Sequence, residues 1–187
     1  MGQVSKKHKY MPSLGRLLGR SVIYGRAGEH ETPYMTRYWF GRLRLHIFYR
    51  GDQDPDCHDH PWDFWTFPFH SYVEEVADPS MAARVQNQSG SYSAKSHRVP
   101  LKHLQVVKAW RLHHRPATHC HRVLGRYSGK DIGGVPAIND RKIVTLVWRT
   151  GADRKWGFLK NRDGKWCWTP WKEYVFGGGK DAPCSDD

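Results

Sequence analysis

The sequence predicts an all-β protein, a sandwich or a barrel, from three observations. The 187 residues include 9 Trp, 9 Tyr and 7 Phe, and aromatic side chains favour half-buried, pleated strands over helical bundles. Several segments alternate apolar and polar residues with a period of two, and turn residues separate them at short intervals. The length corresponds to one domain. No apolar run approaches the ~18 residues of a spanning helix, so we expect no membrane association.

The first 36 residues are expected to form a basic amino-terminal arm with one short helix. Pro12 and Ser13 precede leucines at helical spacing, which predicts a helix at 13–23. Gly15 and Gly19 weaken this helix, because glycine costs up to ~1 kcal/mol relative to alanine in a helix. The arm has no apolar core ahead of a small-residue cleavage site, so we expect no secretory signal and a cytoplasmic location.

Period-two alternation predicts the strands of a β domain that spans 37–176. A strand at 37–50 ends in a turn-rich loop. The next strand, at 64–76, is interrupted at Pro68, a residue that indicates a sheet edge or a bulge, and it is continued or reversed near His70-Ser71. Further strands are expected at 104–112, 143–148, 156–159 and 166–168.

The segments between and after these strands have their own signals. Asp163-Gly164 is a strong hairpin signal between the last two strands. The glycine-rich stretch 125–139 is expected to be a connection. The apolar residues on both faces of 143–148 indicate a strand in a sheet interior. The tail at 177–187 is expected to be disordered because of its composition.

Cysteine usage indicates a reducing compartment. The four cysteines are too few and too irregularly spaced for a disulfide framework, and no CxxC pair indicates a zinc knuckle. We therefore expect free thiols in the cytoplasm.

Charge is unevenly distributed along the chain. The net charge of +12 makes nucleic acid or another polyanion the default partner. Residues 51–83, however, contain eight acidic and no basic side chains, whereas residues 1–50 contain ten basic and two acidic ones. We call 51–83 the acidic block and expect the chemistry of the protein to lie there.

Two histidine pairs suggest a metal site. His58 and His60 are two residues apart, as are His119 and His121, and residues i and i+2 of a strand point to the same face. One such pair is weak evidence, because HxH occurs by chance in a chain with 12 histidines. A single histidine is more often a hydrogen-bonded polar residue on a sheet face. Two pairs could together supply three or four ligands, and the nearby carboxylates favour a divalent cation. The adjacent cysteines are offset by one residue and should pack away from the metal.

Three sequence blocks resemble a group of small bacterial and phage cupins. The blocks are HDHPWDFWTF, the HRV at 121–123, and VWRTGADRKWGF followed by WTPWKEY; the resemblance covers about 38–175. It implies a cupin-like double-stranded β-helix, or jelly-roll barrel, with a metal in its mouth. Carried over by position, His58 and His60 match the first motif and His121 matches the second.

The chain departs from the general cupin pattern at the usual glutamate. Asp63 is the nearest acidic residue after His60, but on an unbroken strand it would face away, so only a bulge at Pro61 could aim it inward. Glu74 and Glu75 lie too far along the chain for a simple match. Asp63 and His119 therefore remain candidate ligands or supporting residues, and a three-histidine or altered site stays open.

The first functional hypothesis is a metal-dependent cupin enzyme that acts on a small polar or anionic molecule. Imidazole ligands suit Fe, Ni, Zn or Mn and do not distinguish oxygenation, isomerisation and hydrolysis. Arg44, His46 and Arg111 are candidates to bind an anionic substrate group, and the alternative for each is a solvated charge on a sheet face.

Two other functions compete with this hypothesis. A nucleic-acid-binding protein could use the basic arm and four late tryptophans as stacking platforms: Trp156, Trp166, Trp168 and Trp171. A cupin that binds a ligand without turnover is the third possibility. The cupin resemblance also leaves a homodimer possible.

Overall fold

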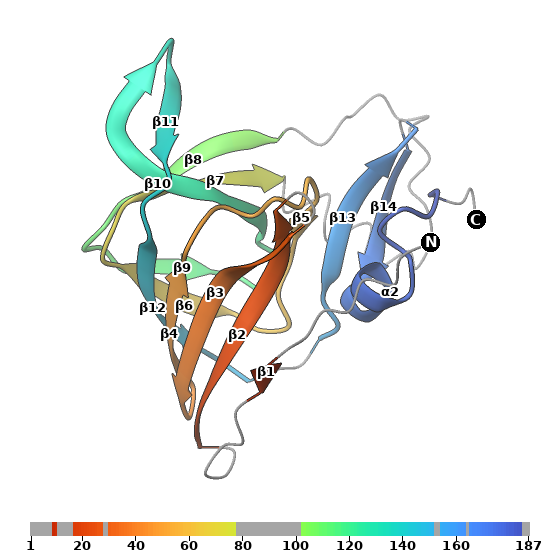
Figure 1. Ribbon diagram of the computed structural model, residues 1–187, viewed down its shortest axis with the longest axis horizontal. Helices are drawn as coiled ribbons and strands as arrows, with labels where there is room; N and C mark the ends of the chain where they lie inside the picture. The colour runs from red at the N-terminus through yellow and green to blue at the C-terminus, as the bar shows by residue number, and fades with distance from the viewer. Residues whose placement is uncertain are drawn as a thin grey trace.

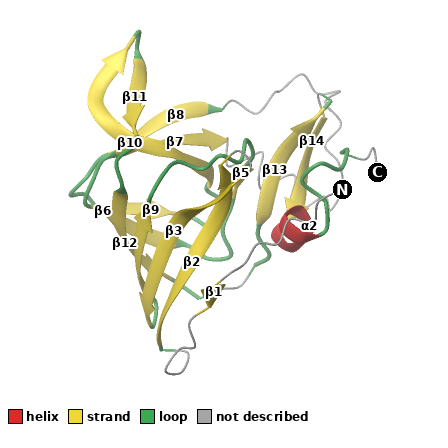
Figure 2. Cartoon of the chain, in the orientation of Figure 1, coloured by secondary structure: helices red, strands yellow, loops and turns green. Residues whose placement is uncertain are grey.

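The structure is a computed structural model that describes residues 9–10, 17–27, 30–77, 102–151, 154–163 and 165–184. These residues form an all-β protein with two antiparallel sheets and a short helix, α2 (Trp171–Phe176), as Figures 1 and 2 show. Within the described ranges, no helix is long and apolar enough to cross a membrane.

The first sheet forms the lower left layer of Figure 1 and contains seven of the described strands. In spatial order they are β1 (Lys9–Tyr10), β2 (Leu18–Ala27), β3 (His30–Phe40), β4 (Leu43–Phe48), β12 (Ile143–Arg149), β6 (Phe64–Pro68) and β9 (His113–Arg115). Strand β12 lies between β4 and β6, which confirms the sheet interior predicted for 143–148. Its β-branched and aromatic residues suit a strand that is paired on both sides.

The second sheet contains the remaining described strands. In spatial order they are β14 (Lys165–Pro170), β13 (Gly157–Arg162), β5 (Cys57–His58), β10 (Cys120–Ile132), β7 (Tyr72–Ala77) and β8 (His103–Val107), and β11 (Val135–Asn139) pairs with β10. The β10–β11 hairpin projects from the body at the top of Figure 1. The connection predicted at 125–139 is therefore largely a hairpin, whose turn uses Gly133 and Gly134 at φ +59° and +79°.

Apolar residues from both sheets meet in a shared core. Phe48 and Ile143 of the first sheet pack with Tyr72, Val107 and Val123 of the second. We call the faces that carry these residues the inner faces of the two sheets.

Beyond this core the inner face of the first sheet becomes polar. In the row next to Ile143, Thr145 pairs with His46, and His46 pairs with Arg37. The following row contains Arg44. Antiparallel partners share a face and successive residues alternate, so these side chains point the same way as Ile143.

The helix predicted at 13–23 is wrong in its described part. Residues 18–23 lie in β2, which pairs with β3, and residues 13–16 lie outside the described residues. The β-branched Val22 and Ile23 fit a strand, and pairing within the sheet outweighs a weak helical spacing.

The strand predicted at 37–50 is the end of β3, a turn, and β4. Gly41 lies in this turn at φ +56°, a conformation that favours glycine. The expected boundary after residue 36 falls inside β3, so residues 18–27 and 30–36 belong to the first sheet and not to a separate arm.

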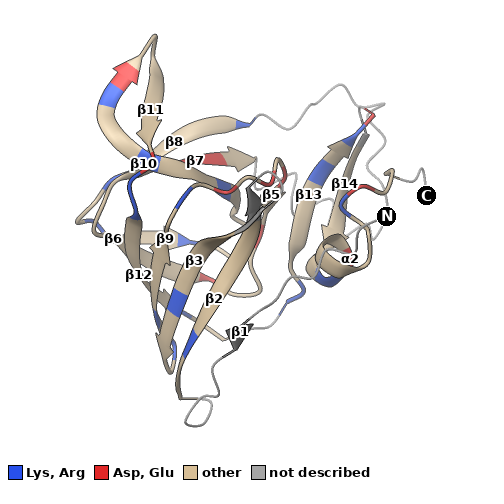
Figure 3. Ribbon diagram, in the orientation of Figure 1, with Lys and Arg blue, Asp and Glu red and all other residues tan. Residues whose placement is uncertain are grey.

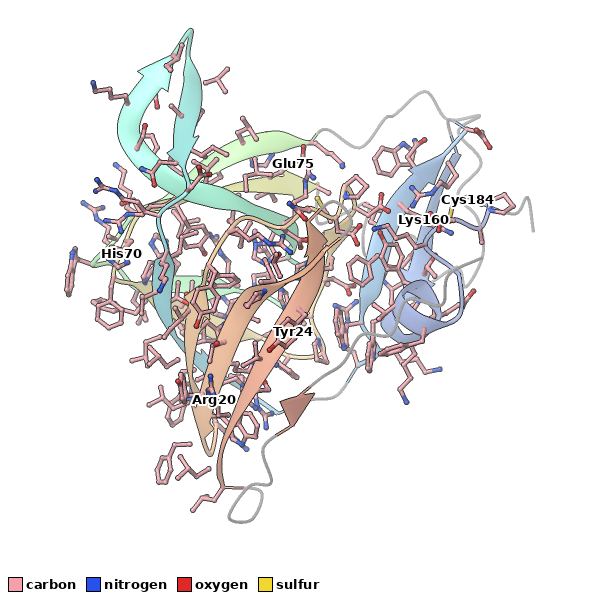
Figure 4. The ribbon with its side chains drawn as sticks, in the orientation of Figure 1. Arg20, Tyr24, His70, Glu75, Lys160 and Cys184 are labelled. Atoms are coloured by element: carbon pink, nitrogen blue, oxygen red, sulfur yellow. A yellow bond between two sulfur atoms is a disulfide. The ribbon has the colours of Figure 1, made fainter. Side chains whose placement is uncertain are left out.

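The tail predicted to be disordered at 177–187 is ordered as far as Cys184, and 185–187 lie outside the described residues. Cys184 is buried and forms a disulfide with Cys167 of β14. The Lys160 ammonium donates to two backbone carbonyls of the tail. Figure 4 shows Lys160 and Cys184 on the same side of the molecule. A covalent bond and a buried cation thus hold a segment that composition alone assigns to disorder.

The disulfide also corrects the expectation of four free thiols. Cys57 and Cys120 are free and buried in a core cluster, where they pack as predicted from their offset. Cys167 and Cys184 are bonded across a separation of 17 residues, a spacing that carries no recognisable pattern. The thiols therefore no longer support a reducing cytoplasm, and the location stays a prediction.

Candidate metal centre

Three histidines form a triangle, which we call the histidine triangle: His58, His60 and His121. Their ring centroids are 5.2 Å (His58–His60), 5.4 Å (His58–His121) and 5.1 Å (His60–His121) apart. One nitrogen of each ring lies within 4.8 Å of the other two. Three imidazoles that share one tetrahedral metal at ~2.0–2.1 Å have ring centroids about 5 Å apart. The spacing of the triangle therefore fits one shared ion.

Strand pairing positions the triangle. His58 of β5 pairs with His121 of β10 on one side and with Phe158 of β13 on the other. Partners in an antiparallel pair share a face, so the two imidazoles lie side by side. His60 follows the end of β5, and its N–H donates to the Ala117 carbonyl at 3.0 Å. The predicted convergence of His58 and His60 is thus present, although a loop and not a strand produces it.

Asp59, between the two histidines, anchors this loop. Its buried carboxylate accepts hydrogen bonds from the Gly157 N–H at 2.7 Å, Arg154 Nη2 at 3.0 Å and Trp168 Nε1 at 3.2 Å. Burial raises the pKa of Asp59, and these hydrogen bonds oppose the rise. Asp59 therefore ties the loop to β13 and β14 and fixes the direction in which its neighbours project.

Glu74 is the acidic residue of the site, although the sequence analysis set it aside because it lies too far along the chain for a simple match to the cupin pattern. It is fully buried on β7. Its Oε2 accepts from His121 Nδ1 at 2.6 Å, and its Oε1 accepts from Arg115 Nη2 at 2.6 Å and from His119 Nε2 at 3.2 Å. Alternation on β7 gives the signal that was missed, because Glu74 occupies the inward position between Tyr72 and Val76.

Glu74 remains ionised at neutral pH. Burial alone would raise its pKa, but the interaction with His121, the hydrogen bonds from His119 and His121, and the charge of Arg115 hold the pKa below its ordinary value. An ionised carboxylate only accepts hydrogen bonds, so His121 Nδ1 carries the proton. His121 Nε2 is then left with its lone pair and faces His60 Nε2 at 3.0 Å. This is the tautomer that a metal ligand requires.

The histidines are neutral at pH 7, as metal ligands must be. Burial lowers the pKa of His58 and of His119 to about 4. Burial, followed by the charge of His121, places the pKa of His60 well below its ordinary value, and burial also lowers that of His121. His58 Nδ1 is shielded from solvent and has no hydrogen-bond partner among the described residues.

Two overlapping groups of side chains could hold a metal: the histidine triangle, and Glu74 with His119 and His121. Both oxygens of Glu74 already accept hydrogen bonds, and the permanent cation of Arg115 lies 2.6 Å from Oε1, so an ion there would face a like charge. The triangle is the better metal site, and Glu74 orients His121 within it.

Aromatic rings line the triangle. His60 lies edge-on to Phe64 with centroids 4.7 Å apart, and His58 lies against Phe158 at 5.6 Å and Trp156 at 6.2 Å. These rings exclude water from one side of the imidazoles, which explains the burial that lowers their pKa values.

The two supporting candidates have different places. His119 reaches the site through Glu74, and its ring centroid is 4.7 Å from that of His121. Asp63 is not part of either group; its Oδ1 accepts from the Ala117 N–H at 2.6 Å. Asp63 therefore braces the segment that precedes His119, and no bulge turns it toward the histidines.

The three candidates for anion binding are divided between two places. Arg44 and His46 lie on the inner face of the first sheet. Arg111 is exposed in the turn between β8 and β9, because the predicted strand at 104–112 ends at Val107 and Trp110 adopts a positive φ of 59°. Arg111 therefore does not line the interior.

Most carboxylates of the acidic block form ion pairs, so their number does not itself indicate a cation site. Tyr174 donates to both Asp54 and Asp56, and Arg162 Nη2 binds Asp56 at 2.7 Å. Glu75, which points away from Glu74, binds Arg122 Nε at 2.7 Å. Within the described part of the acidic block, Glu74 is the carboxylate that accepts hydrogen bonds from the site histidines.

The four tryptophans proposed to stack on bases are packed within the protein. Trp156 and Trp171 stack on each other with centroids 5.4 Å apart, Trp166 is buried, and Trp168 packs against the cluster of Cys57. A nucleic-acid site on the amino-terminal arm stays a prediction, because most of residues 1–16 lie outside the described residues.

The site thus consists of three neutral imidazoles, a carboxylate that orients one of them, and an aromatic wall formed by Phe64, Trp156 and Phe158.

In comparisons with known proteins, no family model and no curated protein matches this chain.

Proposed function

We propose that this protein is a cupin-like jelly-roll barrel that binds a divalent transition metal at His58, His60 and His121 and acts as an enzyme on a small anionic molecule. The observation that carries the proposal is the histidine triangle, in which Glu74 fixes the tautomer of His121. Two facing antiparallel sheets and the resemblance of HDHPWDFWTF to cupins support the same assignment.

The side chains of this chain have distinct roles in the proposal. A metal with three protein ligands keeps open positions, at which it can polarise a substrate oxygen or activate water or dioxygen. Glu74 holds the proton on His121 Nδ1, and Asp59 holds the loop of His58 and His60. The aromatic wall shields the imidazoles from water. The ligand set suits Fe, Ni, Zn or Mn.

Elemental analysis of protein purified without chelators tests the metal. We expect near-stoichiometric transition metal in the wild type, loss in His58→Ala and His60→Ala, and weaker retention in His121→Ala, because each change removes one metal bond. His103→Ala is the matched control, since His103 is an exposed residue on β8. A metal-free wild type from metal-replete cells, or full metal content in His58→Ala, would contradict the proposal.

A further inference from the structure

The inner face of the first sheet carries three arginines and a histidine, which we call the arginine patch: Arg37, Arg44, His46 and Arg149. Arg37 pairs with His46, and Arg44 lies in the next row. Arg149 pairs with the buried Phe64 at the end of β12. Figure 3 shows the basic residues of β3 in blue, in contrast to the acidic residues of β7 in red. Four cationic or potentially cationic side chains therefore face the interior from three adjacent strands.

Several polar atoms of the patch lack a partner. Arg37 Nε, Arg149 Nε and His46 Nε2 are shielded from solvent and have no hydrogen-bond partner among the described residues. Burial lowers the pKa of Arg37, and burial followed by the charges of Arg37 and Arg44 lowers that of His46. Donors shielded from water without an acceptor are unfavourable, and unpaired charges more so. An anion at this place would relieve both penalties.

Other arginines of this protein form ion pairs with carboxylates. Arg115 pairs with Glu74, Arg154 with Asp59 and Arg162 with Asp56, in each case at 3.0 Å or less. Among the described residues, Arg37 and Arg149 have no such carboxylate. Arginines that hold the fold together therefore have carboxylate partners, whereas Arg37 and Arg149 have none among the described residues.

The patch lies beside the histidine triangle. The guanidinium carbons of Arg44 and Arg149 are 6.0 Å and 5.1 Å from the ring centroid of Trp62, which follows His60 by two residues. Arg149 also pairs with Phe64, whose ring centroid is 4.7 Å from that of His60. A small molecule could reach both groups.

We infer that the arginine patch binds the oxyanion group, a carboxylate or a phosphate, of a small molecule whose other end reaches the histidine triangle. Guanidinium forks match the geometry of both oxyanions and bind them by charge-assisted hydrogen bonds. The bound molecule is a substrate only if the proposed function is correct, so the inference rests on that function. It specifies the substrate class and assigns Arg37 and Arg149 to substrate binding. Phosphate and carboxylate are separated by the probes below.

The test uses full-length protein freed of metal by a chelator and then dialysed. Inorganic phosphate and oxalate are titrated calorimetrically at constant ionic strength, with chloride as the reference anion. We expect one of the two to bind and to raise the thermal midpoint above that in chloride. Binding should be at least about tenfold weaker in Arg37→Met and in Arg149→Met, because each removes charge-assisted hydrogen bonds. The tighter of the two anions identifies the oxyanion.

Two controls make the result specific. Arg42→Met removes the same charge from an exposed turn and should bind the anion as the wild type does. Arg37→Lys, which keeps the charge without the fork, should fold and bind with intermediate strength. No binding beyond chloride, or equal weakening by Arg42→Met and Arg37→Met, would overturn the inference.

The same experiment separates this inference from the metal proposal. Metal-free His58→Ala should still bind the anion, because the patch lies on the other sheet. If the wild type binds the anion but takes up no metal, the inference about the arginine patch is supported and the metal proposal is contradicted. If it takes up metal but binds no anion, the metal proposal is supported and the inference about the patch is contradicted.

Discussion

Two groups of charges in the interior of this protein, the one around Glu74 and the arginine patch, differ in how they are paired. Glu74 of the second sheet accepts hydrogen bonds from His119, from His121 and from Arg115 of β9 in the first sheet, all within 3.2 Å. On the first sheet, Arg37 and Arg149 face the same interior without a carboxylate among the described residues. The first arrangement gives its cations a carboxylate partner and fixes side chains in place. The second is complete only with an added anion, and this difference separates residues that position a site from residues that bind a ligand.

The largest expected effect comes from removing the shared carboxylate. Glu74→Ala leaves Arg115 buried and unpaired, so the free energy of unfolding should fall by about 3–5 kcal/mol. Glu75→Ala is the matched control, because the neighbouring residue forms partly exposed ion pairs on the opposite face and should lose about 1 kcal/mol or less. Denaturant unfolding at pH 7 measures both. Equal losses would mean that Glu74 has no special place in the interior.

A milder change at the same residue should affect the metal more than the fold. Glu74→Gln keeps an acceptor for His121 Nδ1 but removes the charge that fixes its tautomer. We expect metal affinity to fall by about 10–100-fold, the usual effect of losing a carboxylate behind a histidine ligand. Competition with a chromogenic chelator measures the affinity, and Glu75→Gln should bind as the wild type does. Unchanged affinity in Glu74→Gln would place the metal away from His121.

Acidification should destabilise the metal-free protein. His58 and His119 have a folded-state pKa of about 4, below the ordinary value of 6.5, so the unfolded chain binds more protons between these values. Stability is therefore fully present above pH 6.5 and is lost as the pH falls toward 4. From pH 7 to pH 5 the loss should be about 2 kcal/mol for each histidine. Unfolding curves at the two pH values test this.

The matched variants are His58→Gln and His103→Gln. His58→Gln should remove only the share of the pH dependence that belongs to this imidazole, about 2 kcal/mol between pH 7 and pH 5, because the other histidines with lowered pKa values remain. His103→Gln changes an exposed residue and should leave the pH dependence intact. A pH dependence in His58→Gln equal to that of the wild type would show that this imidazole is solvated.

Local patterns predicted the strands well where the pattern and the pairing agree. Residues 143–148 are apolar on both faces and lie inside a sheet, and Asp163 adopts a positive φ of 54° in the predicted hairpin turn. The helix at 13–23 failed in its described part because its leucine spacing is weaker than the pairing of β2 with β3. No local signal reveals a pairing partner that is distant in the sequence.

The sequence analysis identified the three histidines of the site, but it did not identify the carboxylate that binds them. His58, His60 and His121 come together because two motifs meet on adjacent strands. Glu74 was dismissed because it lies far from His60 in the sequence, yet parity along β7 decides which side chains face inward. The excess of acidic residues was misleading, since Asp54 and Asp56 pair with the carboxyl-terminal part of the chain.

The smallest expected effect is the sharpest test of the comparison. In chloride buffer, with neither metal nor oxyanion, Arg37→Met should leave the free energy of unfolding unchanged or raise it by up to about 1 kcal/mol, because a half-buried guanidinium without a carboxylate partner among the described residues is replaced by an apolar side chain. Arg115→Met should lower it by about 3 kcal/mol, because Glu74 then loses its permanent counter-charge. Denaturant unfolding of the two variants at pH 7 gives the contrast. A residue that is neutral or unfavourable for stability but required for oxyanion binding is one that the fold retains for its ligand. If Arg37→Met is as destabilising as Arg115→Met, then Arg37 already has its counter-charge within the chain, and the arginine patch does not differ from the group around Glu74.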